Sequence, residues 1–235
     1  MDNSNGAAVP PTSESKREET QHMDMLPIRI ISKVVRGYGR GSSDLGIPTA
    51  NLDLAPSSTA AGSQSPQQLV RSIPLSKPPK ETTLEDLPTG IYWGFGRIIP
   101  STNNRNANND NLGQAAPEPI EFAQVYAVAA SIGYNPTYGN KEKTVEPHLI
   151  APRDTTVHCE QRHASKCGET VLPNFSGQSL RLSLVGYLRP ELPFEGLDKL
   201  TVAIKKDITQ AEQLAKGTEK LPLQEKEWVQ SQTDL

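Results

Sequence analysis

The sequence is poor in aromatic residues and has no long apolar run. Aromatic residues make up 5% of the 235 residues, whereas 20 prolines and 17 glycines indicate that part of the chain is loop. No stretch approaches the ~18 consecutive apolar residues of a membrane span, so we expect no such span. The first 20 residues lack an apolar segment, which argues against a secretory signal.

The chain also has few cysteines and no excess of positive charge. Two cysteines cannot form the framework of a disulfide-rich secreted domain, so the cytoplasm is the expected compartment, with a mitochondrial fraction left open. The net charge of −3 argues against nucleic-acid binding, because such binding needs a clustered basic surface.

Glycines are concentrated in residues 36–46, Arg-Gly-Tyr-Gly-Arg-Gly-Ser-Ser-Asp-Leu-Gly, around which the rest of the chain is organised. Successive backbone N–H groups in such a loop form a concavity that attracts anions, and arginine donors suit phosphate. The loop is neither a P-loop nor a dinucleotide-binding fingerprint, because no lysine follows Gly46 and position 42 is serine. An ordinary glycine-rich turn is the alternative interpretation.

Thr49 and Asn51 follow this loop, behind Pro48. A hydroxyl and an amide oxygen are hard ligands of the kind that Mg²⁺ accepts while it keeps most of its waters. The stretch therefore predicts a phosphate-and-magnesium loop. Asp44 is a competing metal ligand, although aspartate also favours turns.

The run from residue 34 to 52, with its Gly-Ile-Pro-Thr-Ala-Asn string, resembles the signature of riboflavin kinases, which phosphorylate riboflavin to FMN. Three further stretches resemble the same family, at residues 89–92, 141–150 (with the Asn-Pro pair at 135–136 before it) and 186–191. The resemblance covers roughly residues 28–216. It implies an ATP:riboflavin 5′-phosphotransferase that uses Mg²⁺, with Zn²⁺ or Mn²⁺ as alternatives, and we expect a monomer.

Glu146 is the candidate catalytic base. It lies in an otherwise apolar strand, where an unpaired carboxylate is costly, and the resemblance places it on the family's catalytic glutamate. The alternative is a solvated position on an edge strand. His148, two residues later, shares the same strand face and is expected either to orient Glu146 or simply to pack.

Ligand contacts are expected from several segments. The ATP-binding candidates are Gly37, Gly39, Arg40, Gly41, Ser43 and Thr49 with, by the resemblance, Asn140 and Thr144. Arg40 has a second interpretation, in which it only pins the loop. Lys141 and Lys143 are expected either to attend phosphates or to be solvated. Ser43 stands where some family members have a lysine.

The flavin ring needs an apolar slot with a few polar groups on its rim. The resemblance puts this slot near the end of the 182–191 strand and the helix that follows, with Leu182, Val185 and Arg189 as candidates. A salt bridge to Glu191 or Glu195 is the alternative role for Arg189.

The fold is predicted to be mainly β. Leu180, Leu182 and Leu184 alternate with other residues at a period of two, and no β-helix-β alternation appears. These patterns favour a small antiparallel barrel, and the resemblance implies a six-stranded Greek-key barrel. Residues 197–214 show helical spacing, so we expect an amphipathic helix across one opening of the sheet, stopped by Gly217.

The chain is expected to consist of a disordered tail (1–25), a kinase domain (26–217) and a C-terminal extension (218–235) with a short helix near 223–229 that frays. Long loop insertions are expected at about 53–87, 100–119 and 151–174. Deleting residues 1–24 should leave activity unchanged, because they lack core-forming residues. The third insertion carries His158, Cys159, His163 and Cys167, either a zinc site or an ordinary surface loop.

Other functions stay open at this point. A non-catalytic flavin- or nucleotide-binding barrel would bind its ligand without turnover. An oligonucleotide-binding barrel is disfavoured by the acidic charge balance and the few aromatic residues. An attached adenylyltransferase domain is not expected, because neither tail can hold a second α/β domain.

Overall fold

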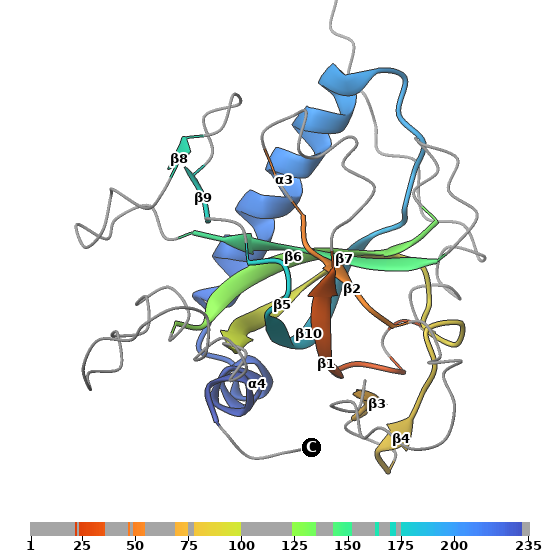
Figure 1. Ribbon diagram of the computed structural model, residues 1–235, viewed down its shortest axis with the longest axis vertical. Helices are drawn as coiled ribbons and strands as arrows, with labels where there is room; N and C mark the ends of the chain where they lie inside the picture. Colours follow the sequence, from red (N-terminus) through yellow and green to blue (C-terminus); the bar gives the residue numbers. More distant parts are fainter. Residues whose placement is uncertain are drawn as a thin grey trace, which may run out of the picture.

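A computed structural model describes residues 22, 24–35, 47, 49–54, 69–74, 78–99, 124–134, 143–151, 163–164, 170–172 and 175–231. Most of them form one antiparallel sheet with the order β4-β3-β1-β10-β5-β6-β7, and β2 also pairs with β1 (Figure 1). The strands are β1 (Ile28–Val35), β2 (Asn51–Leu52), β3 (Leu69–Ser72), β4 (Lys80–Glu81), β5 (Gly90–Ile99), β6 (Tyr126–Gly133), β7 (Thr144–Ile150) and β10 (Ser179–Arg189). A separate pair consists of β8 (His163–Ala164) and β9 (Thr170–Val171). The predicted mainly β class is confirmed.

The short strand β2 connects the two ends of the β1-β10-β5-β6-β7 path. Leu52 pairs with Val34 of β1, and the Ala50 N–H donates to the Pro147 carbonyl of β7 at 2.8 Å. The segment therefore lies between β1 and β7. Full closure into a six-stranded barrel stays a prediction.

β3 and β4 lie inside residues 53–87, which the sequence predicts to be a loop throughout, so that prediction is wrong at these two strands. β3 pairs with the first half of β1, from Ile28 opposite Ser72 to Ile31 opposite Leu69, and Val70 is buried in the core. Likewise β8 and β9 lie within the predicted irregular segment 151–174. Strands this short carry too little alternation to stand out in a polar segment. The predicted insertion at 100–119 lies outside the described residues.

The sheet has two apolar faces. The first, here called the inner face, carries Tyr92, Val128, Ala130 and Leu182 in one buried cluster. The second, the helix-covered face, carries Trp93, Phe95, Ala129 and Val185 in another. Neighbouring residues of β5 and β6 alternate between the two clusters, as strand geometry requires.

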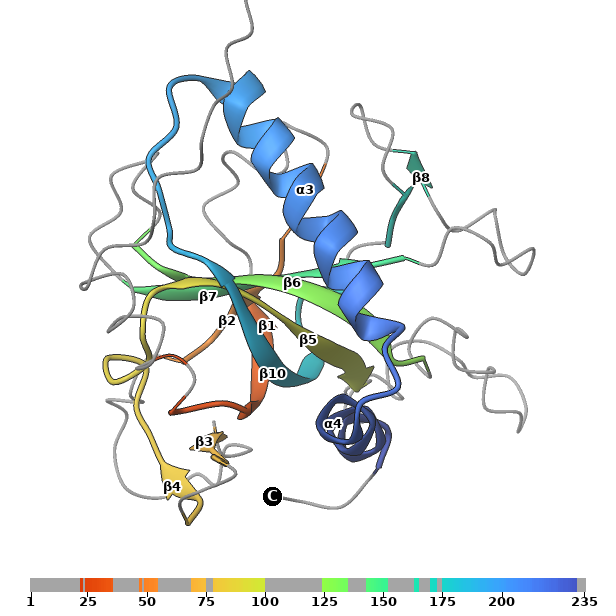
Figure 2. The ribbon, with the colours of Figure 1, turned by 180° about the vertical axis from the view of Figure 1, so that it is seen from behind.

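α3 (Leu197–Ala215) lies on the helix-covered face, over β5 and β6 (Figure 2). Its Ile208 and Ala211 are buried in the cluster that contains Trp93. The predicted helix and its stop are confirmed, because the Gly217 N–H donates to the Leu214 carbonyl at 3.0 Å. The predicted position across an opening of the sheet is wrong, since the apolar stripe of α3 meets a sheet face instead.

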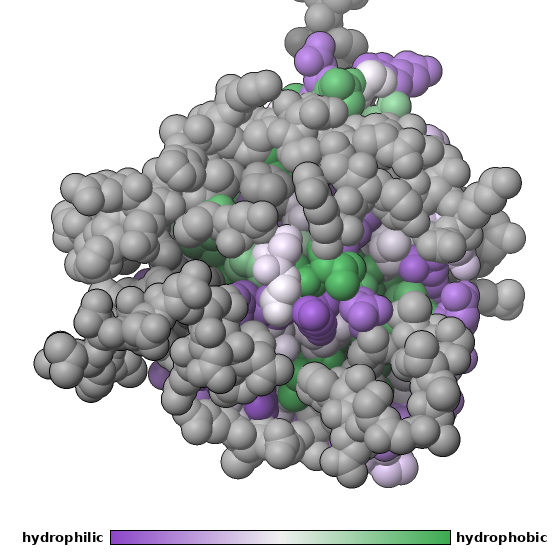
Figure 3. Space-filling view, viewed as in Figure 1, coloured by the Kyte–Doolittle hydropathy of each residue, from purple (hydrophilic) through white to green (hydrophobic). Residues whose placement is uncertain are grey.

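None of the helices within the described residues is long and apolar enough to cross a membrane. On the face seen in Figure 1, the described residues present hydrophilic side chains around small hydrophobic areas (Figure 3).

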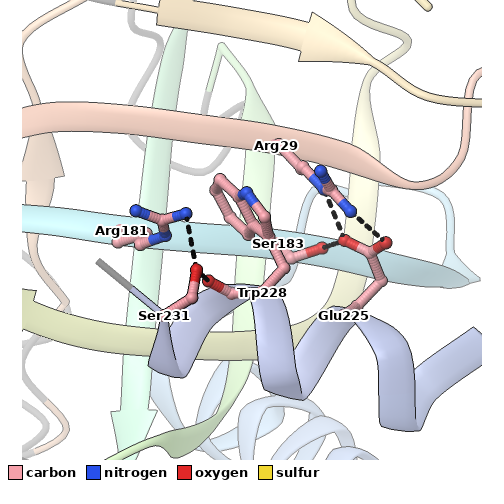
Figure 4. Close-up of polar contacts among 6 residues, drawn as sticks. All are labelled: Arg29, Arg181, Ser183, Glu225, Trp228 and Ser231. Atoms are coloured by element: carbon pink, nitrogen blue, oxygen red, sulfur yellow. Dashed lines mark hydrogen bonds and ion pairs between the residues drawn. The ribbon is translucent and has the colours of Figure 1, made fainter. Parts of the chain in front are cut away.

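The short helix predicted near residues 223–229 is confirmed as α4 (Lys220–Gln230). The predicted fraying is wrong for the residues that the structure describes, because α4 is packed against the sheet with Trp228 and Val229 buried. The Trp228 ring lies between two guanidinium groups, those of Arg29 at 4.6 Å and Arg181 at 4.0 Å (Figure 4). Glu225 accepts two hydrogen bonds of 2.9 Å from Arg29 and one of 2.7 Å from the Ser183 hydroxyl. The helix is thus held by partners on β1 and β10 that its own pattern does not reveal.

His22 belongs to the tail predicted to be disordered, yet it is buried. Its ring stacks on Tyr187 at 3.9 Å, and its Nδ1 lies 2.7 Å from the Tyr92 hydroxyl. Burial raises the pKa of Tyr92, so the hydroxyl keeps its one proton, which it donates to the Pro88 carbonyl at 2.8 Å. The His22 Nδ1 is therefore the donor to Tyr92.

The prediction of disorder is thus wrong at His22, while residues 1–21 lie outside the described residues. From the sequence, activity is expected to be unchanged when residues 1–24 are deleted, because that segment is predicted to contain no core-forming residue. That reason fails at His22, because the deletion would remove a buried contact.

Gly94 lets β5 and β10 approach closely. A Cβ at Gly94 would lie 1.9 Å from the Ser183 carbonyl oxygen, whereas a Cβ at Gly96 would first meet a side-chain atom, Cγ2 of Val128, at 3.0 Å. We expect Gly94→Ala to lower the free energy of unfolding by about 1–3 kcal/mol, as other overpacked cores do. Urea denaturation would measure this, with Gly96→Ala as the milder control. Equal midpoints for the two variants would contradict the explanation.

Candidate active site

Glu146 lies on the helix-covered face of β7. Val145 and Leu149 are buried in the inner cluster, so Glu146 and His148 point to the other side of the sheet. Glu146 is half-buried, neither fully solvated nor sealed in the core. His148 shares its face as predicted and is buried. An orienting role for His148 stays a prediction.

Thr49 meets Glu146 across a separation of 97 residues, its Oγ1 donating to Oε2 at 3.2 Å. The next residue, Ala50, is tied to β7 through its N–H and the Pro147 carbonyl. The Thr49 hydroxyl is thus held against the carboxylate by backbone pairing as well as by its own hydrogen bond.

Asn51 lies on the same side as Thr49. Ala50 and Leu52 are buried in the inner cluster, whereas Thr49 and Asn51 are half-buried and alternate with them. Both candidate metal ligands therefore share a face with Glu146. The Thr49 hydroxyl gives its proton to Glu146, and the oxygen types of Thr49 and Asn51, a hydroxyl and an amide, are ones that a hard cation such as Mg²⁺ accepts.

A second threonine contacts the other oxygen of the carboxylate. Thr144 Oγ1 donates to Oε1 of Glu146 at 3.1 Å and lies 3.4 Å from the Gly133 carbonyl at the end of β6. Each carboxylate oxygen of Glu146 thus accepts a hydrogen bond from a threonine hydroxyl. The predicted contact of Thr144 with ATP stays a prediction.

Ile47 anchors the end of the glycine loop. It is fully buried in the cluster on the helix-covered face, together with Trp93 and Ile208. This fixes the chain two residues before Thr49, a role that sequence reasoning missed. A β-branched apolar residue at the end of a loop rich in glycine and polar residues was the available signal.

Several predicted ligand contacts, among them the phosphate cradle, lie outside the described residues. They are Gly37, Gly39, Arg40, Gly41, Ser43, Asp44, Asn140 and Lys141.

Lys143, predicted to meet phosphate or solvent, is buried, and its Nζ donates to the carbonyls of Glu85, at 3.1 Å, and Leu87. Burial lowers the pKa of Lys143, although Glu85 and Asp86 oppose this effect. The solvated interpretation is wrong, because this ammonium holds the 85–87 turn.

Of the suggested zinc cluster, His158, Cys159, Cys167 and the side chain of His163 lie outside the part of the chain that the structure describes. No group of three such ligands occurs among the described residues. The zinc site stays a hypothesis.

Arg189 pairs with α3. Its guanidinium donates to the two carboxylate oxygens of Asp207 at 2.9 and 2.7 Å. Arg189 thus forms a salt bridge, but the predicted partners Glu191 and Glu195 are wrong, because the partner is Asp207. Glu195 pairs with Lys199. A flavin contact of Arg189 stays a prediction.

Leu182 and Val185, both predicted for the flavin slot, face opposite sides of β10. Leu182 is buried in the inner cluster and Val185 in the cluster under α3. One slot cannot be lined by both, because the sheet separates them.

A row of four residues crosses the helix-covered face. Glu146 pairs with Ser131 of β6, Ser131 with Ile91 of β5, and Ile91 with Arg189 of β10. A shift in pairing between Tyr187 and Arg189 brings Arg189 opposite Ile91, and such bulges often re-aim side chains beside active sites. With neighbouring strands about 4.8 Å apart, the three steps span about 14 Å. Sequence reasoning missed Ser131 and Ile91, because only the strand register links them to Glu146.

The comparisons with known proteins point to one family. The family model described as "Flavokinase: Riboflavin kinase" matches residues 25–215, which include Thr49, Asn51, Thr144 and Glu146. Riboflavin kinase of Aspergillus fumigatus is 32% identical over 184 residues, 77% of this chain and 72% of that protein. Riboflavin kinase of Mus musculus is 31% identical over 208 residues, 88% of this chain and 94% of that protein.

The solved structure of riboflavin kinase from Trypanosoma brucei aligns with 89% of this chain and 92% of that chain, at a TM-score of 0.47 and 19% identity. The family-model match covers most of the sequence and the whole of the Thr49–Glu146 site. This chain belongs to the riboflavin kinase family.

Proposed function

We propose that this protein transfers the γ-phosphate of ATP to the ribityl 5′-hydroxyl of riboflavin, giving FMN and ADP. The observation that carries the proposal is the 3.2 Å hydrogen bond between Thr49 and Glu146. It places the proposed metal ligands Thr49 and Asn51 beside a carboxylate. Phosphoryl transfer needs little more than a phosphate cradle, a divalent cation and a group that steers the attacking hydroxyl. Membership of the riboflavin kinase family supports the substrate pair.

Glu146 acts as the base. Its carboxylate accepts the proton of the 5′-hydroxyl while the alcohol oxygen forms a bond to the γ-phosphorus. The bond between that phosphorus and the β,γ-bridging oxygen breaks, and ADP leaves with the electron pair. Thr49 donates to one carboxylate oxygen, so the base lies beside the proposed metal ligands before the substrates arrive.

Thr49 and Asn51 would hold the divalent cation through their side-chain oxygens, with Mg²⁺ as the proposed ion and Mn²⁺ or Zn²⁺ as alternatives. When bound, the cation neutralises charge on the phosphate oxygens. Thr49 can serve the cation and Glu146 together, because the first uses an oxygen lone pair and the second uses the hydroxyl proton. The glycine loop at residues 36–46 would cradle the phosphates.

Riboflavin would lie along the row from Glu146 to Arg189. The row spans about 14 Å, comparable with a three-ring system carrying a five-carbon chain. Glu146 stands at the hydroxyl end, Ser131 offers a polar contact for the chain, and Ile91 gives the ring an apolar floor. The Arg189–Asp207 pair lies at the far end. This assignment keeps Arg189 in the flavin site and leaves Leu182 out of it.

Replacing Ile91 with alanine should raise KM for riboflavin by about 10-fold or more, the usual effect of removing apolar groups from a binding pocket, and leave KM for ATP within about 2-fold. Steady-state kinetics with each substrate varied in turn would measure both constants. Leu182→Met, a conservative change on the inner face, is the control and should leave both constants unchanged. An unchanged KM for riboflavin in folded Ile91→Ala protein would contradict the placement of the ring.

The function itself is tested by incubating the purified protein with riboflavin, ATP and Mg²⁺ and separating FMN from riboflavin by chromatography. We expect FMN to form and chelation of the metal to stop its formation. Binding of riboflavin or ATP without any FMN would favour the non-catalytic barrel instead. A monomer located in the cytoplasm is part of the same proposal.

A further inference from the structure

The hydroxyl of Thr144 is placed to hold the carboxylate of Glu146. It has one proton and two neighbouring acceptors, Oε1 of Glu146 at 3.1 Å and the Gly133 carbonyl at 3.4 Å. The carboxylate is the shorter contact and the charged one, so it receives the proton. Because Thr49 already donates to Oε2, both carboxylate oxygens are then held.

The backbone around Thr144 makes this donor rigid. Thr144 pairs with Gly133 of β6 and Glu146 pairs with Ser131, so both residues belong to the same ladder and face the same side. Threonine is branched at Cβ, which restricts its first side-chain torsion. Glutamate has three rotatable side-chain bonds and needs such partners to keep one orientation. The hydroxyl is therefore a fixed donor and Glu146 is the mobile group that it fixes.

We propose that Thr144 is a positioning residue for Glu146. Its hydroxyl holds Oε1, so that Oε2 stays directed at Thr49 and the proposed metal ligands, where the acceptor hydroxyl would meet the phosphate. This inference rests on the proposed function, because it takes Glu146 as the base. It also gives Thr144 a role different from the nucleotide contact that the sequence suggested.

The two roles predict different kinetics. A group that only aligns the base affects the transition state, so its loss lowers kcat and leaves KM nearly unchanged. A group that binds the nucleotide contributes to the ground state as well, so its loss raises KM for ATP. Replacing Thr144 therefore distinguishes the two roles: a lowered kcat indicates positioning of the base, and a raised KM for ATP indicates nucleotide binding.

The experiment compares Thr144→Val, which keeps the shape and loses the hydroxyl, with Thr144→Ser, which keeps the hydroxyl. Steady-state FMN formation should show kcat lowered about 10- to 100-fold in the valine variant, with both KM values within about 3-fold of the parent. The serine variant should recover kcat to within about 3-fold. Thr209→Val, on the exposed side of α3, is the matched control and should leave the kinetics unchanged.

Three results would overturn the proposal: parental kcat in the valine variant, a raised KM for ATP with kcat unchanged, or a serine variant as impaired as the valine variant. Thr144→Ala replaces the valine variant should that protein not fold. Failure of the proposed function looks different, because the parent protein would then form no FMN. Activity lost in Glu146→Gln but kept in Thr144→Val would leave the proposed function standing and remove the positioning role.

Discussion

Glu146→Gln should lower kcat for FMN formation by ~10²–10⁴, the usual contribution of a general base. The amide is nearly the same size as the carboxylate, but it cannot take a proton from the 5′-hydroxyl. One of its two positions becomes an NH₂ group, so only one of the hydrogen bonds from Thr49 and Thr144 can be kept. Riboflavin and ATP should still bind, because their other contacts are unchanged.

The measurement is FMN formed per unit time at saturating substrates, with riboflavin binding followed separately by calorimetry. Glu81→Gln serves as the matched control, since the Glu81 side chain is 77% exposed and pairs only weakly with Arg71 at 3.4 Å. Near-normal turnover in Glu146→Gln would reject Glu146 as the base, whatever its contacts.

Glu225→Ala should destabilise the protein by about 3–5 kcal/mol, as is usual when one partner of a buried ion pair is removed. The Glu225 side chain is 3% exposed and its partner Arg29 is 20% exposed, so little water can replace the lost carboxylate. The buried Ser183 hydroxyl loses its acceptor as well. For a protein of this length the loss corresponds to a fall in Tm of about 10 °C.

Thermal unfolding followed by circular dichroism would measure this effect. Glu227→Ala is the control on the same helix, because the Glu227 side chain is exposed. The environment of Trp228 provides a second signal, since its ring is held between Arg29 and Arg181 (Figure 4). Similar unfolding temperatures for the two variants would show that the Glu225 contacts do not hold α4 in place.

Local patterns were sufficient for much of the fold. Leu180, Leu182 and Leu184 repeat at a period of two and form the inner side of β10, and the apolar spacing of residues 197–214 matches α3. Both patterns can be read within a single stretch of the sequence, because each element buries one of its faces. The packing of α4 and of His22 was missed because their partners, such as Arg29 and Tyr92, lie far away in the sequence.

The candidate site shows the same division. Thr49, Asn51 and Glu146 could be chosen from their chemistry and from the motif, and the structure places them on one face. Ser131 and Ile91 could not be chosen, because their place beside Glu146 follows from the register of three strands. Placing Leu182 and Val185 in one slot failed because successive residues of β10 face opposite sides of the sheet, and these two lie on different sides.

The juxtaposition of Thr49 with Glu146 is tested most directly by a double-mutant cycle on kcat/KM for FMN formation, with Thr49→Val, Glu146→Gln and the variant that carries both changes. Residues that act as one unit show strongly non-additive losses. We predict that the double variant is only slightly less active than the worse single variant, at least about 10-fold better than the product of the two losses would give. Losses that simply multiply would show that the hydroxyl and the carboxylate act independently and would contradict the account.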